Sequence, residues 1–248
     1  MCRSGENDFV YSGKVNSDFE RLKKCTRYEK FRDESARLKA QPRPGIYEKF
    51  MPTVFTLVVG RREKDPVIMF ENTMKDLRER WDVTEKMPVH GPWHHAIIPG
   101  ILVATLRNNG YPFDDEDVEE ALYRGHMVPA AACGFLGTCG CAVGVGVAVS
   151  VVMGSTPLHY EERLKSLASA AEAIRRVSVG GGGEKGHCCT KSAYISIPYA
   201  VTVLGELGYK VPSPMPREMV GRCKVSAINK RCHRERCMYF PAHFRKKD

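Results

Sequence analysis

Apolar positions recur at helical spacing along much of the chain, and residues typical of helix ends divide it into segments. Asp65 and Pro66 place an N-cap before a proline at the first helical position, which predicts a helix running to about Trp81. A second helix is expected over 94–108. A third is expected over 114–125, where acids in the first turns match the helix dipole.

Two more helices are expected in the second half of the chain. Residues 159–177 form an amphipathic pattern, and 188–207 continue as a helix in which Pro198 predicts a kink. The short apolar run at 54–59 fits either a strand or a helical turn, because its periodicity does not distinguish them. From Val211 onward, proline and cysteine are frequent, which indicates a tail that wraps over the body.

The chain contains no strand-rich block and no internal repeat, so we predict an all-α, mainly helical fold. Its centre is expected to be a buried glycine-rich helix, and its C-terminal tail irregular and rich in cysteine. A length of 248 residues suits one core. We divide the chain into a charged helical extension (1–44), a helical core (45–210) and a basic tail that packs on the core (211–248).

Residues 127–158 carry no charged side chain, a run long enough to cross a bilayer. Pro129, several glycines and three cysteines interrupt this run, and it has no aromatic belt. We therefore expect a buried core helix rather than a membrane span.

The net charge of +9 is concentrated at the ends of the chain. Residues 210–248 hold eleven Lys or Arg against three acids, which is +8, and residues 1–50 hold twelve against eight, which is +4. A basic tail of this kind is more often a solvated end than a nucleic-acid site. The first residues contain no apolar signal segment, so we expect a cytoplasmic protein.

Cysteine is the residue type that points to chemistry, because eight of the ten cysteines fall in the second half of the chain, mostly in clusters. These are Cys133, Cys139, Cys141, Cys188, Cys189, Cys223, Cys232 and Cys237. Cysteine clusters in a chain without a secretory signal more often bind metal than form disulfides. All eight are therefore candidate metal ligands.

Thiolates suit both zinc and iron-sulfur clusters. Structural zinc sites usually have two knuckles with two to four residues between the cysteines, whereas Cys139-Gly140-Cys141 and the adjacent pair at 188–189 are tighter. Nearby glycines would let backbone N–H groups approach the sulfides of a cluster. We predict a [4Fe-4S] cluster, with zinc as the alternative. A simpler alternative for each single cysteine is a small buried hydrophobic residue.

Residues 65–241 resemble an uncharacterised domain-of-unknown-function family of anaerobic archaea and bacteria. The resemblance rests on the sequence HGPWHH at 90–95, the stretch 133–157, the cysteine pair at 188–189 and the tail cysteines. More distantly, the order of these features is similar to the α chain of iron-sulfur-dependent L-serine dehydratases and to L-cysteine desulfidases.

The distant resemblance implies which cysteines bind the cluster. Cys133, Cys141 and the sequence GSTP at 154–157 fall at nearly the spacings of the dehydratases' first ligand, a cysteine eight residues later and Gly-Gly-Thr-Pro. Cys188 or Cys189 matches their second ligand. Their third ligand, about ten residues further on, has no counterpart here, so the resemblance requires another cysteine to replace it.

In those enzymes one iron has no protein ligand and polarises a leaving group while a base removes a proton. The sequence PWHHAIIP at 92–99 stands where they have a substrate loop leading into a helix that reads Ile-Ile-Pro. The catalytic candidates are His90, His94 and His95, and the substrate-binding candidates are Pro92, Trp93 and Lys191. Each histidine also has the simpler interpretation of capping or packing a helix.

Two function classes follow from these residues. The first is a cluster-dependent lyase, such as a dehydratase or desulfidase, or a sulfur-handling enzyme that acts on a small polar or anionic substrate. The second is a non-catalytic iron-sulfur or zinc-binding accessory subunit of a larger enzyme, which would dock through the charged N-terminal helix and the basic tail. Neither nucleic acid nor a membrane is an expected partner.

Overall fold

The computed structural model describes residues 44–81, 86–180 and 188–246, and over these residues the chain is helical without any strand. The all-α prediction is therefore confirmed. The α-helices are α3 (Pro44–Val59), α4 (Pro66–Glu79), α5 (Trp93–Asn108), α6 (Asp115–His126), α7 (Ala132–Phe135), α8 (Gly140–Val152), α9 (Tyr160–Gly180), α10 (Cys189–Glu206) and α11 (Pro216–Met219). Two short 3-10 helices follow, η1 (Arg234–Arg236) and η2 (Pro241–Lys246). From Gly45 onward these elements form one compact unit.

The predicted N-caps hold the starts of two helices. One carboxylate oxygen of Asp65 accepts from the backbone N–H groups of Val67 at 2.7 Å and Ile68 at 3.1 Å, which fixes the start of α4. At α6, Asp114 caps the first turn while the carboxylate of Asp117 accepts from the backbone N–H of Asp114 at 2.9 Å. The helices predicted over 65–81, 94–108, 114–125, 159–177 and 188–207 all form, with ends shifted by at most three residues.

The structure shows the conformation of one segment that the sequence left open and of one that it assigned to the core. Residues 54–59 are helical and form the last part of α3. The uncharged stretch 127–158 contains the short α7 and then α8, most of which is buried, as expected of a core helix. Across the described ranges, no helix combines the length and the apolar character that a membrane span requires. Residues 1–43 of the predicted charged helical extension lie outside the described residues.

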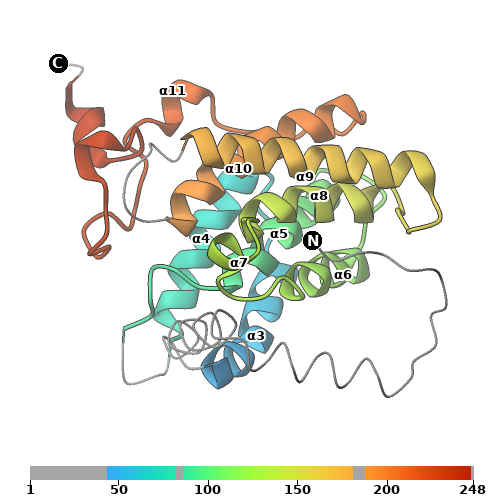
Figure 1. The fold of residues 1–248 in the computed structure, drawn as a ribbon, viewed down its shortest axis with the longest axis horizontal. Coiled ribbons are helices and arrows are strands. Elements are labelled where there is room, and N and C mark those ends of the chain that lie inside the picture. Colours follow the sequence, from blue (N-terminus) through green and yellow to red (C-terminus); the bar gives the residue numbers. More distant parts are fainter. Residues whose placement is uncertain (1–43, 82–85, 181–187, 247–248) are drawn as a thin grey trace, which may run out of the picture. The chain divides into compact units, whose positions relative to one another are not determined.

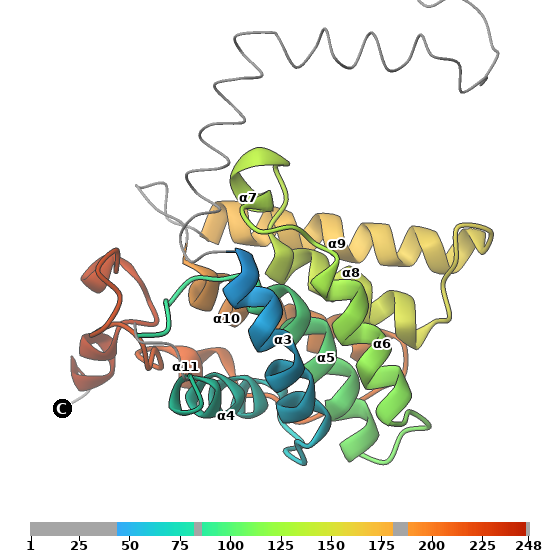
Figure 2. The ribbon, with the colours of Figure 1, turned by 90° about the horizontal axis from the view of Figure 1, so that it is seen from below.

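Helix α5 forms the centre of the bundle (Figures 1 and 2). Every residue from Trp93 to Leu106 is buried, and the helix contacts α4, α6, α8 and α10. It therefore has no polar face, and its hydrophobic pattern is that of a helix surrounded by others. Helix α9 lies against α8 and α10 at the side of the bundle. Helix α10, which begins at the adjacent cysteines, also contacts α4, α5 and α8.

Two glycines in α8 allow its neighbours to approach closely. A Cβ at Gly144 would lie 2.9 Å from the ring of Pro99 in α5 and 3.1 Å from Ile98. A Cβ at Gly146 would lie 2.8 Å from Ala170 in α9. These glycines are explained by helix packing, so only the glycines nearer the cysteines remain candidates for contact with a cluster.

The tail folds back on itself and contacts the bundle. The backbone N–H of Gly221 donates to the carbonyl of Met238 at 2.9 Å, and that of Cys223 donates to the carbonyl of Tyr239 at 2.8 Å. The ring of Tyr239 lies 5.2 Å from the ring of Tyr194 in α10, measured between centroids. These contacts hold both ends of the cysteine-containing segment next to the first turns of α10 (Figure 1).

Gly125 of α6 packs against the backbone of α5, and we expect Gly125→Ala to destabilise the bundle. The added Cβ would lie 2.3 Å from the carbonyl oxygen of His95 and 2.7 Å from Pro99, so one helix has to move. The free energy of unfolding should fall by about 2 kcal/mol, as in other overpacked cores, despite the better helix propensity of alanine. Urea denaturation followed by circular dichroism measures this change. The matched control is Gly205→Ala in α10, where no atom lies within 4 Å of the new Cβ, and its stability should not fall.

Candidate metal centre

All eight cysteines in the described part of the chain are free thiols, and the structure divides them into two sets. The pocket set comprises Cys188, Cys223, Cys232 and Cys237, which line one pocket. The helix set comprises Cys133 in α7, Cys139 and Cys141 at the start of α8, and Cys189 at the first position of α10. The adjacent pair is therefore split between the two sets.

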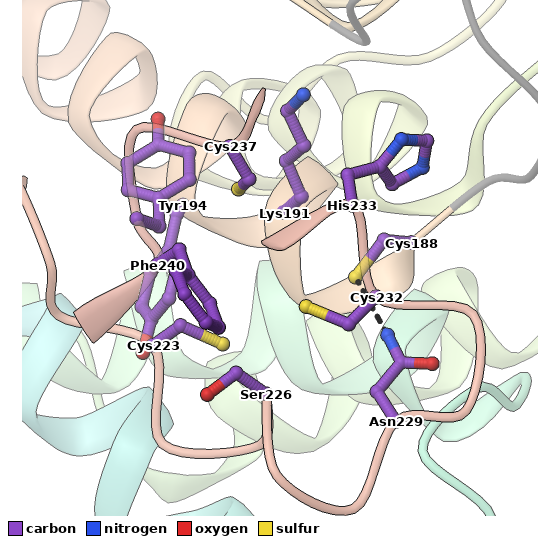
Figure 3. A pocket seen from close by; sticks show the side chains of 11 residues that line it. Cys188, Lys191, Tyr194, Cys223, Ser226, Asn229, Cys232, His233, Cys237 and Phe240 are labelled. Atoms are coloured by element: carbon purple, nitrogen blue, oxygen red, sulfur yellow. Dashed lines mark hydrogen bonds between the residues drawn. The ribbon is translucent and has the colours of Figure 1, made fainter. Parts of the chain in front are cut away.

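The pocket lies between the first turns of α10 and the folded tail (Figure 3). The sulfur atoms of the pocket set point toward the space that they enclose. The aromatic side chains of Tyr194, Tyr239 and Phe240 form part of the wall. Lys191 and His233 also line the pocket, with the ammonium group of Lys191 directed away from the sulfur atoms. The result is a largely apolar cavity that contains four thiols.

Backbone N–H groups lie near three of these sulfur atoms. The sulfur of Cys232 accepts from the N–H of Arg234 at 3.4 Å. At Cys188, the N-cap residue of α10, burial raises the pKa of the thiol and the N–H groups of Lys191 and Thr190 in the first helical turn oppose this rise. At Cys223, burial likewise raises the pKa and the N–H groups at 225 and 226 oppose it. Such bonds stabilise thiolates, the form in which cysteine binds metals.

Without a cation, Cys188 and Cys223 hold their protons. Burial raises the pKa of Cys188 to about 11, and the N–H groups of α10 offset only part of this rise. Burial also raises the pKa of Cys223, and the neighbouring thiols Cys232 and Cys237 add to the effect. Four thiolates in this space therefore require a positive charge between them, which a metal centre supplies.

His90 is connected to the pocket by a hydrogen bond to Asn229. The Nδ1 atom of His90 accepts from the backbone N–H of Cys189 at 3.4 Å, so its Nε2 carries the proton and donates to Oδ1 of Asn229 at 3.3 Å. The amide of Asn229 donates in turn to the sulfur of Cys188 at 3.7 Å. In this arrangement His90 positions Asn229, which contacts a candidate ligand. Its predicted catalytic role stays a prediction.

The other two histidines pack inside the bundle. His94 is fully buried, its Nδ1 lies 3.0 Å from the carbonyl of Gly91, and desolvation lowers its pKa to about 3. His95 is 9% exposed, and its Nδ1 lies 3.0 Å from the carbonyl of Val128. Its ring covers Gly140, where an added Cβ would lie 2.1 Å from it. Neither ring lines the pocket, and the catalytic role predicted for each stays untested.

The structure separates the predicted substrate residues. Pro92 is the residue before α5, and Trp93 is buried with its ring centroid 5.7 Å from that of Trp81. Only Lys191 lines the pocket. Sequence reasoning missed Asn229 and the aromatic wall, because their part in the pocket depends on how the tail folds back. The signal available for Asn229 was its position between two tail cysteines.

The donor groups are too far apart for one metal ion. Zinc bound by thiolates has Zn–S distances near 2.3 Å, which brings the sulfur atoms almost into contact. Within 44–81, 86–180 and 188–246, no three Cys, His, Asp or Glu side chains lie close enough to share an ion. The pocket set instead lines a small cavity of about 20 Å³ (Figure 3).

An ion pair fixes the tail next to Cys223. Glu71 of α4 accepts from Arg222 at 2.7 and 3.1 Å and from the hydroxyl of Tyr194 at 3.0 Å. The side chains of Glu71 and Arg222 are only 13% and 21% exposed. This ion pair is therefore largely buried, and it connects the tail with α4 and α10.

We expect Glu71→Gln to lower the free energy of unfolding by about 2 kcal/mol, because it leaves the charge of Arg222 half-buried without its carboxylate. Thermal and urea denaturation measure the loss, and limited proteolysis shows whether the tail is the part that is released. Glu79→Gln is the matched control. Its partner Lys75 is 70% exposed, so its effect should stay within about 0.5 kcal/mol. Equal effects of the two variants would contradict this role for Glu71.

Comparisons with known proteins agree with the resemblance only at the level of the family. Neither the curated proteins nor the solved structures contain a match to this chain. A model of one protein family matches residues 54–240, which include all of α4 to α10 and both cysteine sets. Because this match covers well over half of the chain, the protein belongs to the family of unknown function DUF5714.

Proposed function

We propose that this protein is an iron-sulfur protein and that its pocket set of cysteines binds one [4Fe-4S] cluster. The observation that supports the proposal is the convergence of four thiols, one from α10 and three from the tail, around one space (Figure 3). Four cysteine thiolates are the ordinary ligand complement of a [4Fe-4S] cluster. The residues thus match the cofactor in number and in chemistry.

The spacing of the thiols favours a cluster over zinc. A cubane is larger than a single ion and holds its ligand sulfur atoms farther apart, which agrees with the finding that no three donor groups of the described residues lie close enough to share one ion. N–H groups directed at the sulfur atoms and aromatic side chains around them are features that tune a cluster's stability and potential. Zinc at this site would require the tail to contract around the ion, whereas a cubane would require the cavity of about 20 Å³ to widen.

A complete set of four thiolates favours a cluster that transfers electrons or stabilises the fold. A lyase of the dehydratase kind needs one iron without a protein ligand, so that substrate can bind there. In the pocket each iron of a cubane has a cysteine available. Of the two function classes, the non-catalytic iron-sulfur subunit is therefore better supported, and the lyase remains a prediction from resemblance.

Anaerobic purification of the full chain, followed by iron, zinc and acid-labile sulfide analysis, tests the proposal. We expect a brown protein with iron and sulfide in equal amounts, at least about four of each per chain. Stoichiometric zinc without sulfide would replace the cluster by a zinc site, and a colourless, metal-free protein would exclude both.

A substrate screen separates the two function classes. With the cluster intact, we expect no pyruvate, ammonia or sulfide from serine, cysteine or related acids, because the pocket leaves no iron open to substrate. Turnover of any of these compounds that depends on the cluster would favour the lyase instead.

A further inference from the structure

The four cysteines outside the pocket also lie near one another, around the first turn of α8. Cys139 is the N-cap residue of α8, and Cys141 lies in its first turn with 1% exposure. The sulfur of Cys141 donates to the backbone carbonyl of Cys189 at 3.6 Å, which links α8 to α10. Cys133 in the exposed α7 completes the helix set, and its pKa is raised by burial and by the nearby Cys139 thiol.

The surroundings of Cys139 resemble those of Cys188, because both are N-cap residues with backbone N–H groups nearby. The neighbouring Cys141 thiol lowers the pKa of Cys139 to about 6, and the backbone N–H groups of Ala142 and Cys141 and the hydroxyl of Ser192 also lower it. N–H groups arranged in this way stabilise a thiolate, as they do at Cys188. The helix set is therefore more than a group of small apolar residues in a core.

No neighbouring element packs on the glycines in and after α7. A Cβ added at Gly134 or Gly137 would meet no atom within 4 Å, and Gly137 has a φ of +64°, which favours glycine. On this side of the helix set Cys133 is exposed, whereas Cys141 on the inner side is buried.

The adjacent residues Cys188 and Cys189 contribute one thiol to each set because α10 begins between them. Cys188 has extended backbone angles, φ −131° and ψ 107°, and Cys189 is the first helical residue. Successive side chains at such a junction point in different directions. The thiol of Cys188 lines the pocket with the tail cysteines, while Cys189 interacts electrostatically with Cys139 and Cys133 as well as with Cys188.

We propose that the helix set binds a second [4Fe-4S] cluster, so that the chain carries two clusters joined through adjacent ligands. The inference rests on the proposed function and extends it. One cubane takes four cysteine ligands, so eight thiols in two sets of four match two cubanes. Adjacent Cα atoms are 3.8 Å apart, which keeps the two clusters close enough for their unpaired electrons to interact when both are reduced.

The test is metal analysis and electron paramagnetic resonance of the full chain, purified anaerobically and reduced with dithionite. The wild type should contain about eight irons and eight sulfides, twice the content of one cubane, and its spectrum should show two interacting reduced clusters. Cys188→Ala and Cys189→Ala form a matched pair of variants. Each should lose about half of the iron and leave the spectrum of one isolated cluster.

The outcomes separate the second cluster from the first. If the wild type holds about four irons and only pocket variants such as Cys237→Ala lower that number, the second cluster is excluded and the proposed function stands. If only helix-set variants lower the iron content, the pocket is not a cluster site. If a single substitution misfolds the chain, the wild-type spectrum still distinguishes one cluster from two. The double variant Cys139→Ala/Cys141→Ala gives a further test of the helix set.

Discussion

Cys223→Ala combined with Cys237→Ala is expected to remove about four irons and four sulfides per chain, the content of one cubane. Both thiols line the pocket, and alanine supplies no ligand in their place. Because metal-binding free energy contributes directly to folding, the tail should also lose its protection against proteases. Iron and sulfide analysis together with limited proteolysis measure both effects.

Ser226→Ala is the control for this variant. Ser226 lines the same pocket, but its hydroxyl is no iron ligand, so the substitution should leave iron and sulfide at the wild-type values. An unchanged iron content in the double cysteine variant would exclude the pocket as a cluster site. A loss in both variants would indicate that the pocket tolerates no change, and Cys232→Ala would then have to be compared with a conservative change outside the pocket.

Lowering the pH from 7 to 4 should destabilise the protein through His94 by about 3 kcal/mol. This imidazole is fully buried, and desolvation lowers its pKa to about 3. Within the described residues its Nε2 has no hydrogen-bond partner that could accept a proton. The folded chain therefore keeps His94 neutral under conditions in which the unfolded chain protonates it.

Proton binding determines the direction in which the free energy of unfolding changes with pH. Below pH 6.5 the unfolded state binds a proton at His94 that the folded state does not bind, so stability falls with falling pH until the folded-state pKa near 3 is reached. His94→Gln removes the titration and keeps a donor for the carbonyl of Gly91. Urea denaturation at pH 7, 5 and 4 should show a shallower loss of stability in the variant. Parallel pH profiles would contradict the assignment.

The fold was largely predictable because its helix ends are encoded locally. Asp65 with Pro66, and Asp114 with its following acids, place two helix starts through side-chain capping. Residues 54–59 were ambiguous because a six-residue apolar run satisfies both periodicities, and only packing in α3 decides it. Of the uncharged stretch 127–158, only α8 is the buried core helix that the sequence predicted, and most residues before and after it are exposed or half-buried. This division depends on backbone turns that its composition does not reveal.

The site was predictable in residue type but not in arrangement. All eight candidate cysteines fall into one of two sets, whereas the sequence suggested a single centre with ligands drawn from both. Adjacent Cys188 and Cys189 look equivalent in sequence, and only the start of α10 between them separates their directions. The pairing of Cys223 with Tyr239 joins residues that carry no pattern linking them, so the pocket could be found only from the folded tail.

The most direct measurement is anomalous diffraction at the iron edge from crystals of the anaerobically purified protein. The central claim is that thiols from α10 and the folded tail hold one cluster between them. It predicts strong iron density in the space enclosed by Cys188, Cys223, Cys232 and Cys237, with each sulfur bonded to an iron. An ordered pocket without iron density, in crystals that contain iron elsewhere, would contradict it.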